Sequence, residues 1–137
     1  MIQKIKLVTY LQQYGEHWAD VLPENCPPEE VCIAAQEVFY RFTLSEDAIV
    51  PRDWFNHLTL YPKINFEDRI IAAGLSLWNC QERILKEKKL PAFKKCKGLA
   101  KISLMPEDGV IKQTSKDFYH YTWWRTTMCN LKKAELV

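Results

Sequence analysis

Glycine is scarce in this sequence, which contains only four glycines among its 137 residues. These glycines do not form a glycine-rich phosphate loop or the dinucleotide fingerprint of a Rossmann domain. The sequence also has no nucleophile elbow, and its histidines, cysteines and aspartates do not have the spacing of a zinc site. Kinase, Rossmann and zinc-hydrolase functions are therefore disfavoured, and we expect no bound metal.

Paired cysteines are lacking too. No two of the five cysteines have the two-residue separation of a zinc ribbon or a redox motif. They are scattered along the chain as Cys26, Cys32, Cys80, Cys96 and Cys129. We expect reduced and partly buried thiols, which are typical of a cytoplasmic protein.

Long apolar runs are absent as well. No run approaches the length of a membrane span, and charged residues interrupt the first seven positions, so we expect neither a membrane segment nor a signal peptide. The apolar fraction of 47% and the charged fraction of 26% are those of an ordinary globular domain rather than a disordered chain. We predict a single domain over residues 1–137, long enough to bury a core without disulfides.

Positive charge is missing from one region and concentrated in another, although the net charge is only +2. Residues 7–40 contain no lysine or arginine, whereas the stretch from Lys86 to Lys101 contains seven lysines and one acidic residue, Glu87. Such a stretch could contact nucleic-acid phosphates. A solvated helix end and loop is the favoured interpretation, because neither arginines nor interleaved aromatic residues accompany the lysines.

Aromatic residues, by contrast, are abundant and gather near the end of the chain. Residues 118–129 are almost entirely β-branched or aromatic, which favours a strand. Alternation would place Phe118, His120, Thr122 and Trp124 on one face and Tyr119, Tyr121, Trp123 and Arg125 on the other. Because the first face holds an imidazole beside a hydroxyl, we expect any chemistry there.

The N-terminal half is expected to contain helices and loops. Residues 2–14 have apolar positions at helical spacing, although part of this segment also fits a strand. Residues 28–42 fit a helix that begins with a proline, but residues 38–43 fit a buried strand equally well, and periodicity does not decide between them. Another short helix is expected to begin at Pro51 and to include His57.

The C-terminal half is expected to supply a mostly antiparallel sheet from residues 74–128, which makes the fold α+β. A strand over residues 74–78 should lead into a helix that is capped by Asn79. Residues 99–112 should form a hairpin, because an Asp-Gly pair lies between two apolar segments. The charged tail from Leu131 is expected to fray.

Two histidines occur in the pattern His-x-Thr-apolar. His57 is followed by Thr59, and His120 is followed by Thr122. This pair of motifs resembles the 2H phosphoesterases, in which each histidine acts as acid or base on a phosphodiester and each threonine binds phosphate oxygens. The resemblance implies that both histidines face one cleft.

An ordered series of short motifs covers more of the chain. It consists of Tyr40-Arg41, residues 74–78, residues 97–104, residues 109–111, and the His-x-Thr-Trp-Trp sequence from His120. This order resembles a family of small bacterial proteins for which no activity is established. It also resembles, more distantly, the ADP-ribosyltransferase-like domains of the RES type.

The resemblance to RES-type domains implies roles for five residues. Arg41 would hold a phosphate of NAD, Ser76 would contact the ribose, and Tyr40 would pack beside the nicotinamide. His120 and Thr122 would lie on a neighbouring strand and face the same cleft, as the catalytic pair. A nucleotide-handling, NAD-binding domain is the function that we expect first.

The RES-type reaction also needs a glutamate that stabilises the oxocarbenium-like state. Glu82 and Glu107 are the nearest in order, and neither has a motif that marks it as catalytic. Whether the chain is an enzyme therefore stays open at the level of sequence.

A non-catalytic interaction module is the third interpretation. The strand over residues 118–125 would then offer a protein partner an aromatic face, since exposed Trp, Tyr and Arg favour interfaces. The three interpretations make different demands. The phosphoesterase needs His57 and His120 in one cleft, the NAD site needs Arg41, Ser76 and His120 together, and the module needs an exposed aromatic patch.

Overall fold

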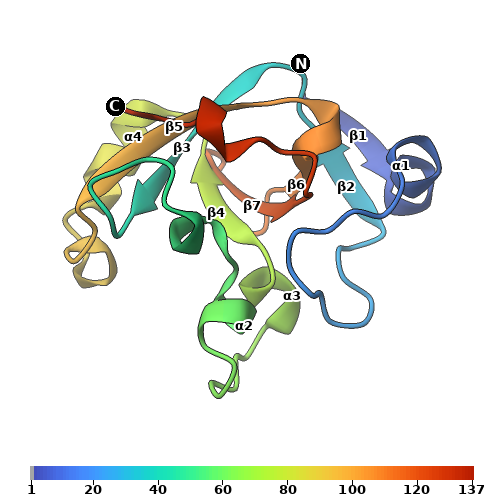
Figure 1. The fold of residues 1–137 in the computed structure, drawn as a ribbon, viewed down its shortest axis with the longest axis horizontal. Coiled ribbons are helices and arrows are strands. Elements are labelled where there is room, and N and C mark those ends of the chain that lie inside the picture. The colour runs from blue at the N-terminus through green and yellow to red at the C-terminus, as the bar shows by residue number, and fades with distance from the viewer. Residues whose placement is uncertain (1) are drawn as a thin grey trace.

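The computed structural model describes residues 2–137 and contains one eight-stranded antiparallel sheet, shown in Figure 1. The strands lie in the order β1-β2-β6-β7-β4-β3-β5-β8. Their bounds are β1 (Gln3–Lys6), β2 (Glu30–Ile33), β3 (Glu37–Thr43), β4 (Leu75–Trp78), β5 (Gly98–Leu104), β6 (Gly109–Lys112), β7 (His120–Arg125) and β8 (Glu135–Leu136). Together with the helices around it, this sheet confirms the α+β prediction.

Four short α-helices surround the sheet in the described part of the chain. They are α1 (Leu7–Tyr14), α2 (His57–Leu60), α3 (Arg69–Ala72) and α4 (Gln81–Glu87). Four 3-10 turns accompany them: η1 (Pro51–Trp54), η2 (Pro91–Phe93), η3 (Pro106–Asp108) and η4 (Leu131–Lys133). In Figure 1, α1 lies beside β1 at one end of the sheet, α4 lies by β3 and β4, and α2 and α3 lie together below β4. Within residues 2–137, no helix has the length and apolar character needed to cross a bilayer.

The aromatic strand β7 is the centre of the core rather than a surface. Trp123 is completely buried in a cluster that includes Leu77 and Trp54. Trp124 is equally buried on the opposite face, in a cluster with Tyr10 and Val110. The predicted alternation of faces is therefore correct, but the chain itself covers both faces, so the two tryptophans stabilise the fold.

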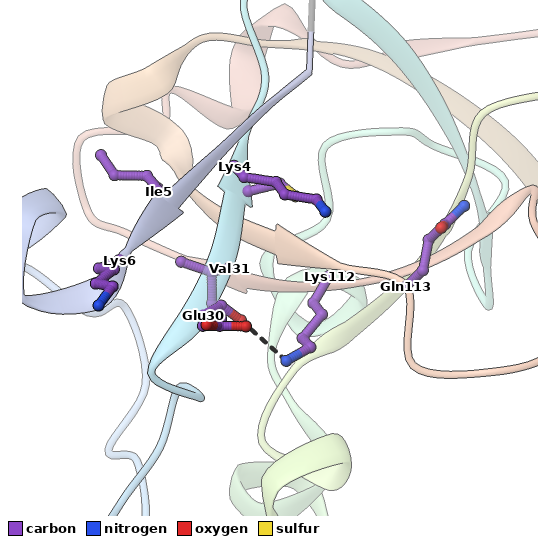
Figure 2. A pocket seen from close by; sticks show the side chains of 8 residues that line it. Lys4, Ile5, Lys6, Glu30, Val31, Lys112 and Gln113 are labelled. Carbon is purple, nitrogen blue, oxygen red and sulfur yellow. Dashed lines mark hydrogen bonds between the residues drawn. The ribbon is translucent and has the colours of Figure 1, made fainter.

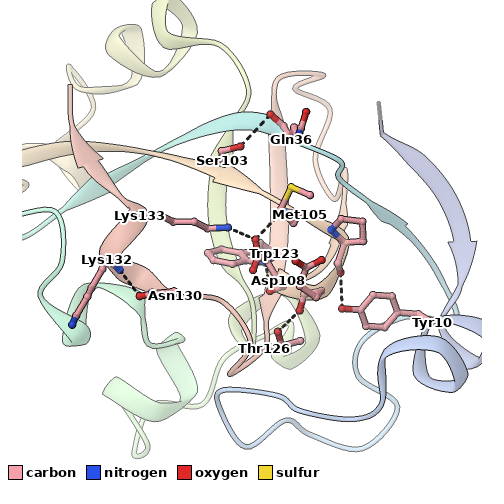
Figure 3. A network of polar contacts seen from close by, with 12 residues as sticks. Tyr10, Gln36, Ser103, Met105, Asp108, Trp123, Thr126, Asn130, Lys132 and Lys133 are labelled. Carbon is pink, nitrogen blue, oxygen red and sulfur yellow. Dashed lines mark hydrogen bonds and ion pairs between the residues drawn. The ribbon is translucent and has the colours of Figure 1, made fainter.

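The turn that was expected to close a hairpin joins strands that are not neighbours. β5 pairs with β3 and β8, whereas β6 pairs with β2 and β7, so the hairpin prediction over residues 99–112 is wrong. The reason is the network around η3 in Figure 3. The buried carboxylate of Asp108 accepts a hydrogen bond from the Met105 amide (2.8 Å) and forms an ion pair with Lys133. The backbone carbonyl of Asp108 accepts a hydrogen bond from Trp123 Nε1 (3.2 Å). These contacts direct the chain from one part of the sheet to another.

The N-terminal half contributes more sheet than its composition indicates. β1, β2 and β3 all lie within the first 43 residues, where helices and loops were expected. Residues 2–14 divide into β1 and the helix α1. Residues 28–42 form β2 and most of β3 rather than a helix, which confirms the alternative strand over residues 38–43. Helical spacing in these segments is overridden by pairing with strands that are distant in the sequence.

Two further local predictions are corrected. The helix α4 has Cys80 as its N-terminal flanking residue, with no side-chain cap, so Asn79 is not its cap. The C-terminal tail does not fray, because β8 pairs with β5 through Ala100 with Leu136 and Lys101 with Glu135. The amide of the last residue also donates to the Leu99 carbonyl at 2.8 Å.

Candidate functional site

A cavity opens where β3 and β4 diverge. These strands share a single registered pair, Tyr40 with Trp78, and we call the gap beyond it the β3–β4 seam. Arg41 bridges the seam, because its Nη1 donates to the Ser76 carbonyl and its Nε donates to the Asp53 carbonyl, each at 3.0 Å. Arg41 therefore holds one side of the opening in place.

The cavity at this seam is lined by β3, β4, η1, α2 and the segment after α4. Its volume of about 590 Å³ is in the range of sites for small ligands. Four of the lining residues are basic: Arg41, Arg52, His57 and Lys95. Five are aromatic: Phe42, Tyr61, Phe66, Trp78 and Phe93. The lining thus combines positive charge with flat apolar rings.

Asp53 is the one acidic residue that lines the cavity, and its carboxylate is hydrogen-bonded to backbone amides. The side chain is 5% exposed and accepts hydrogen bonds from the amides of Leu44 (3.0 Å) and Ser45 (3.4 Å). Within residues 2–137, no salt bridge includes Arg52, Lys95 or another basic residue of the cavity. The free charge in the cavity is therefore positive, which favours an anionic ligand.

His57 begins α2 at the edge of the cavity, held there by the preceding residue. Asn56 is fully buried; its side chain accepts from the Thr59 amide (2.8 Å) and donates to the Ala73 carbonyl (2.9 Å). The imidazole stacks on Phe66, with ring centroids 5.8 Å apart and planes at 23°. Partial burial, together with the charges of Arg41 and Lys95, lowers the pKa of His57 below its ordinary value. At neutral pH the ring is therefore uncharged and able to accept a proton.

Trp78 forms the inner wall of the cavity and carries an unsatisfied donor. The residue is 5% exposed, and its indole Nε1 has no hydrogen-bond partner within residues 2–137. Phe42 and Phe93 pack against the indole with ring centroids 6.0 and 5.9 Å away. A buried N–H without an acceptor costs free energy, and such groups are rare in folded proteins. Because this atom is not accessible to solvent, the missing hydrogen bond is a cost of the fold.

His120 lies on the far side of Trp78 from the other cavity residues and does not line the cavity. It is the register partner of Trp78, with ring centroids 4.8 Å apart, and its Nδ1 is 3.3 Å from Ser115 Oγ. Burial lowers the pKa of His120, against the opposing effect of Asp117 and Glu87. Thr122 is also enclosed, since its hydroxyl contacts that of Thr114 at 2.6 Å. The two residues named as catalytic thus lie outside the cavity.

The structure brings together part of each predicted set. Of the NAD-site residues, Arg41 and Ser76 line the cavity, whereas Tyr40 and His120 do not. Of the phosphoesterase pair, only His57 lines it.

The phosphoesterase motif also differs in its local structure. His57 lies on a helix rather than a strand, and Thr59 Oγ1 donates to Asp20 Oδ1 at 2.7 Å. This threonine hydroxyl is therefore already engaged within the protein, unlike one that is free to bind a phosphate oxygen.

Sequence analysis did not identify Arg52, Lys95 and Phe93 as site residues. Arg52 lies in η1, and the other two belong to the segment that follows α4. The concentration of lysines from Lys86 onward was the available signal. It did not indicate that this segment folds against β3 and β4.

A second opening in the sheet lies between β2 and β6, which share the single pair Cys32 with Ile111. Figure 2 shows this groove, which we call the β2–β6 seam. Lys112 bridges it, because its Nζ donates to the Glu30 carbonyl at 3.0 Å. The volume is about 550 Å³, and the other lining residues are Lys4, Ile5, Lys6, Val31 and Gln113. The groove has lysines but no aromatic ring.

The exposed part of the aromatic segment is small. Phe118 is 79% exposed and Tyr119 is 47% exposed, and both lie directly before the first residue of β7. The interface proposed for residues 118–125 is therefore limited to these two rings, since Tyr121, Trp123 and Trp124 are buried. As for metals, the described residues contain no group of three or more histidine, cysteine, aspartate or glutamate side chains that could hold an ion.

Comparison with protein-family models, with curated proteins and with solved structures found no match for this chain. The site must therefore be interpreted from its own residues.

Proposed function

We propose that this protein binds a nucleotide in the cavity at the β3–β4 seam, and that NAD is one ligand of this class. The observation that carries the proposal is the combination of unpaired basic side chains with aromatic rings around one space of about 590 Å³. A nucleotide has a charged phosphate and a flat base, so it needs both kinds of contact.

The phosphate has two direct partners in this proposal. Arg52 and Lys95 both line the cavity, are exposed, and have no acidic partner within residues 2–137. Arg41 adds its charge from inside the sheet while its hydrogen bonds to two carbonyls keep it in place. Its role differs from the phosphate clamp inferred from RES-type domains, because two of its N–H groups are already used by the fold.

The base has rings on which to stack. Tyr61 and Phe66 surround His57, and Phe66 is stacked on the imidazole. A base that stacks on such rings is held with little regard to its identity, because every base has a π face. The cavity therefore fits a nucleotide without selecting one base.

Binding is better supported than cleavage. The lining carboxylate, Asp53, is committed to backbone amides, and neither Glu82 nor Glu107 lines the cavity. His57 is a candidate general base, but a second acid or base would have to come from the ligand or from water. We also propose a cytoplasmic location, because all five cysteines are free thiols, as expected in a reducing compartment.

Calorimetric titration with NAD, AMP, adenosine and inorganic phosphate tests this proposal. We expect NAD and AMP to bind more tightly than adenosine or phosphate alone, because only they use both the rings and the basic residues. The double variant Arg52→Gln/Lys95→Gln should lose about tenfold in affinity for AMP, as expected for the loss of about 1.4 kcal/mol. The matched control Lys6→Gln/Lys132→Gln removes the same charge elsewhere and should bind as the wild type does. Equal binding by both variants, or no binding by the wild type, would exclude the site.

A further inference from the structure

We propose that the nucleotide in the cavity is part of a single-stranded nucleic acid, whose backbone continues from the cavity along the lysine-rich segment 86–97. This inference rests on the proposed function, because it names the larger molecule to which the bound nucleotide belongs. Its basis is that the same segment forms a wall of the cavity and extends away from it.

The contact between the segment and the cavity is direct. Phe93, Lys95 and Cys96 all line the cavity together with Ala92. Lys94 and Lys97 flank these residues in the sequence, and Lys86, Lys88 and Lys89 lie at the end of α4 or directly after it. Lysines therefore occur along the chain from the end of α4 to the cavity wall.

The lysines of the segment are available to a ligand. All six are exposed, namely Lys86, Lys88, Lys89, Lys94, Lys95 and Lys97. None of them forms a salt bridge within residues 2–137, and the one acidic residue of the segment, Glu87, is paired with Arg83 at 2.6 Å. The repulsion among six uncompensated charges would be relieved by a polyanion, which releases its counterions on binding.

Phe93 is the one aromatic residue of the segment, and the fold brings further rings next to it. Phe93 stacks on Phe42 with centroids 4.9 Å apart, and both rings pack against Trp78. Tyr61 and Phe66 lie on the α2 side of the same cavity. A basic track next to stacking rings is the arrangement by which proteins bind single strands without strong sequence preference. A duplex fits less well, because its bases are already stacked and cannot enter a cavity.

Charge alone does not make such a site, and the β2–β6 seam shows why. That groove has Lys4, Lys6 and Lys112 around a similar volume, but no ring on which a base could stack. Its exposed lysines therefore provide a control for the effect of charge by itself.

Fluorescence anisotropy with a labelled ten-nucleotide single strand, in competition with AMP and with the matching duplex, tests the inference. We expect the single strand to bind at least tenfold more tightly than AMP at low salt, with an affinity that falls steeply as salt increases. The triple variant Lys88→Gln/Lys89→Gln/Lys94→Gln changes no residue that lines the cavity. It should lose about tenfold in affinity for the strand and show a shallower salt dependence, while its affinity for AMP stays unchanged.

The control Lys4→Gln/Lys6→Gln/Lys132→Gln removes the same charge and should bind the strand as the wild type does. Equal losses in the two triple variants, or a strand that binds no more tightly than AMP, would overturn this inference and leave the nucleotide site intact. Tighter binding of the duplex would also overturn it. Failure of both AMP and the strand to bind would instead reject the proposed function. Because all the substituted lysines are exposed, melting curves should show that each variant folds.

Discussion

The sheet opens at two seams, and the same device bridges both. At each seam two neighbouring strands share one registered pair, and a basic side chain donates to a backbone carbonyl of the opposite strand at 3.0 Å. Arg41 does so between β3 and β4, and Lys112 does so between β6 and β2. The openings also have similar volumes, about 590 and 550 Å³.

The two seams differ in burial and in lining. Arg41 lies inside the sheet and satisfies two carbonyls with a planar group, whereas Lys112 makes one exposed contact. Five rings surround the β3–β4 seam, and none surrounds the β2–β6 seam. Volume and positive charge are therefore common to both openings, and the aromatic lining is the reason why we propose a nucleotide site at only one of them.

The largest expected difference between the seams is in stability. Arg41→Met leaves the carbonyls of Asp53 and Ser76 without their donor in a partly buried place, so we expect a loss of about 2 kcal/mol in the free energy of unfolding. Lys112→Met removes one exposed hydrogen bond and should cost less than about 1 kcal/mol. Urea unfolding of both variants measures the difference. Similar losses would mean that the two bridges are equivalent.

Truncation of a lining side chain should affect AMP affinity at the β3–β4 seam and not at the β2–β6 seam. Phe66→Ala is expected to weaken AMP binding by about 5- to 150-fold, which corresponds to the loss of one stacking contact of about 1–3 kcal/mol. Ile5→Ala truncates a half-buried side chain at the other seam and should leave AMP affinity unchanged. Calorimetry decides, and an unaffected Phe66→Ala variant would remove the aromatic part of the account.

The pH dependence of binding should identify the histidine at the site. Because the pKa of His57 is lowered, its ring is neutral at pH 7 and becomes charged only as the pH falls below the ordinary pKa of histidine. The added charge near an anion is worth about 1 kcal/mol, so NAD affinity should increase about fivefold toward pH 5. NAD is a suitable ligand because its pyrophosphate group does not titrate between pH 7 and pH 5. His57→Gln should abolish the increase and His120→Gln should retain it; the reverse result would move the site to β7.

The smallest expected effect is on the pH dependence of stability. Burial lowers the pKa of His120 in the folded state, so the unfolded chain takes up a proton first as the pH falls. The neutral ring contributes fully to the free energy of unfolding above the ordinary histidine pKa. This contribution is lost as the pH falls from the ordinary pKa to the lowered pKa of the folded state. Thermal melts at pH 7 and pH 5 should show a smaller decrease in Tm for His120→Gln than for the wild type. An equal decrease would show that His120 is not responsible.

Local patterns predicted those parts of the fold that depend on neighbouring residues. The strand around Leu75–Trp78, the following helix and the alternating faces of the aromatic strand were all expected, because side-chain periodicity and burial decide them. The Asp-Gly turn was misassigned because the contacts of Asp108 with Lys133 and Trp123 join distant parts of the chain. No local pattern contains that information.

The candidate site, like the fold, was predictable only where local patterns place its residues. Arg41 and Ser76 lie near each other, as the resemblance to RES-type domains implied, although periodicity did not decide whether Arg41 lies on a helix or a strand. Lys95 and Phe93 were missed because their segment reaches the cavity only through the packing of Phe93 on Phe42 and Trp78. His120 was assigned to the cleft because strand alternation gives the face of a side chain but not what covers that face. Trp78 covers it here.

The most direct test of the central claim is a nuclear magnetic resonance titration with AMP that follows the five indole N–H signals, with Trp78 assigned by the variant Trp78→Phe. Our account predicts that the Trp78 Nε1–H signal moves on binding, because the ligand fills the cavity that this residue lines, while the amides of Lys4, Lys6 and Lys112 stay unchanged. Movement of those amides with an unchanged Trp78 signal would contradict the account, because the ligand would then lie at the β2–β6 seam.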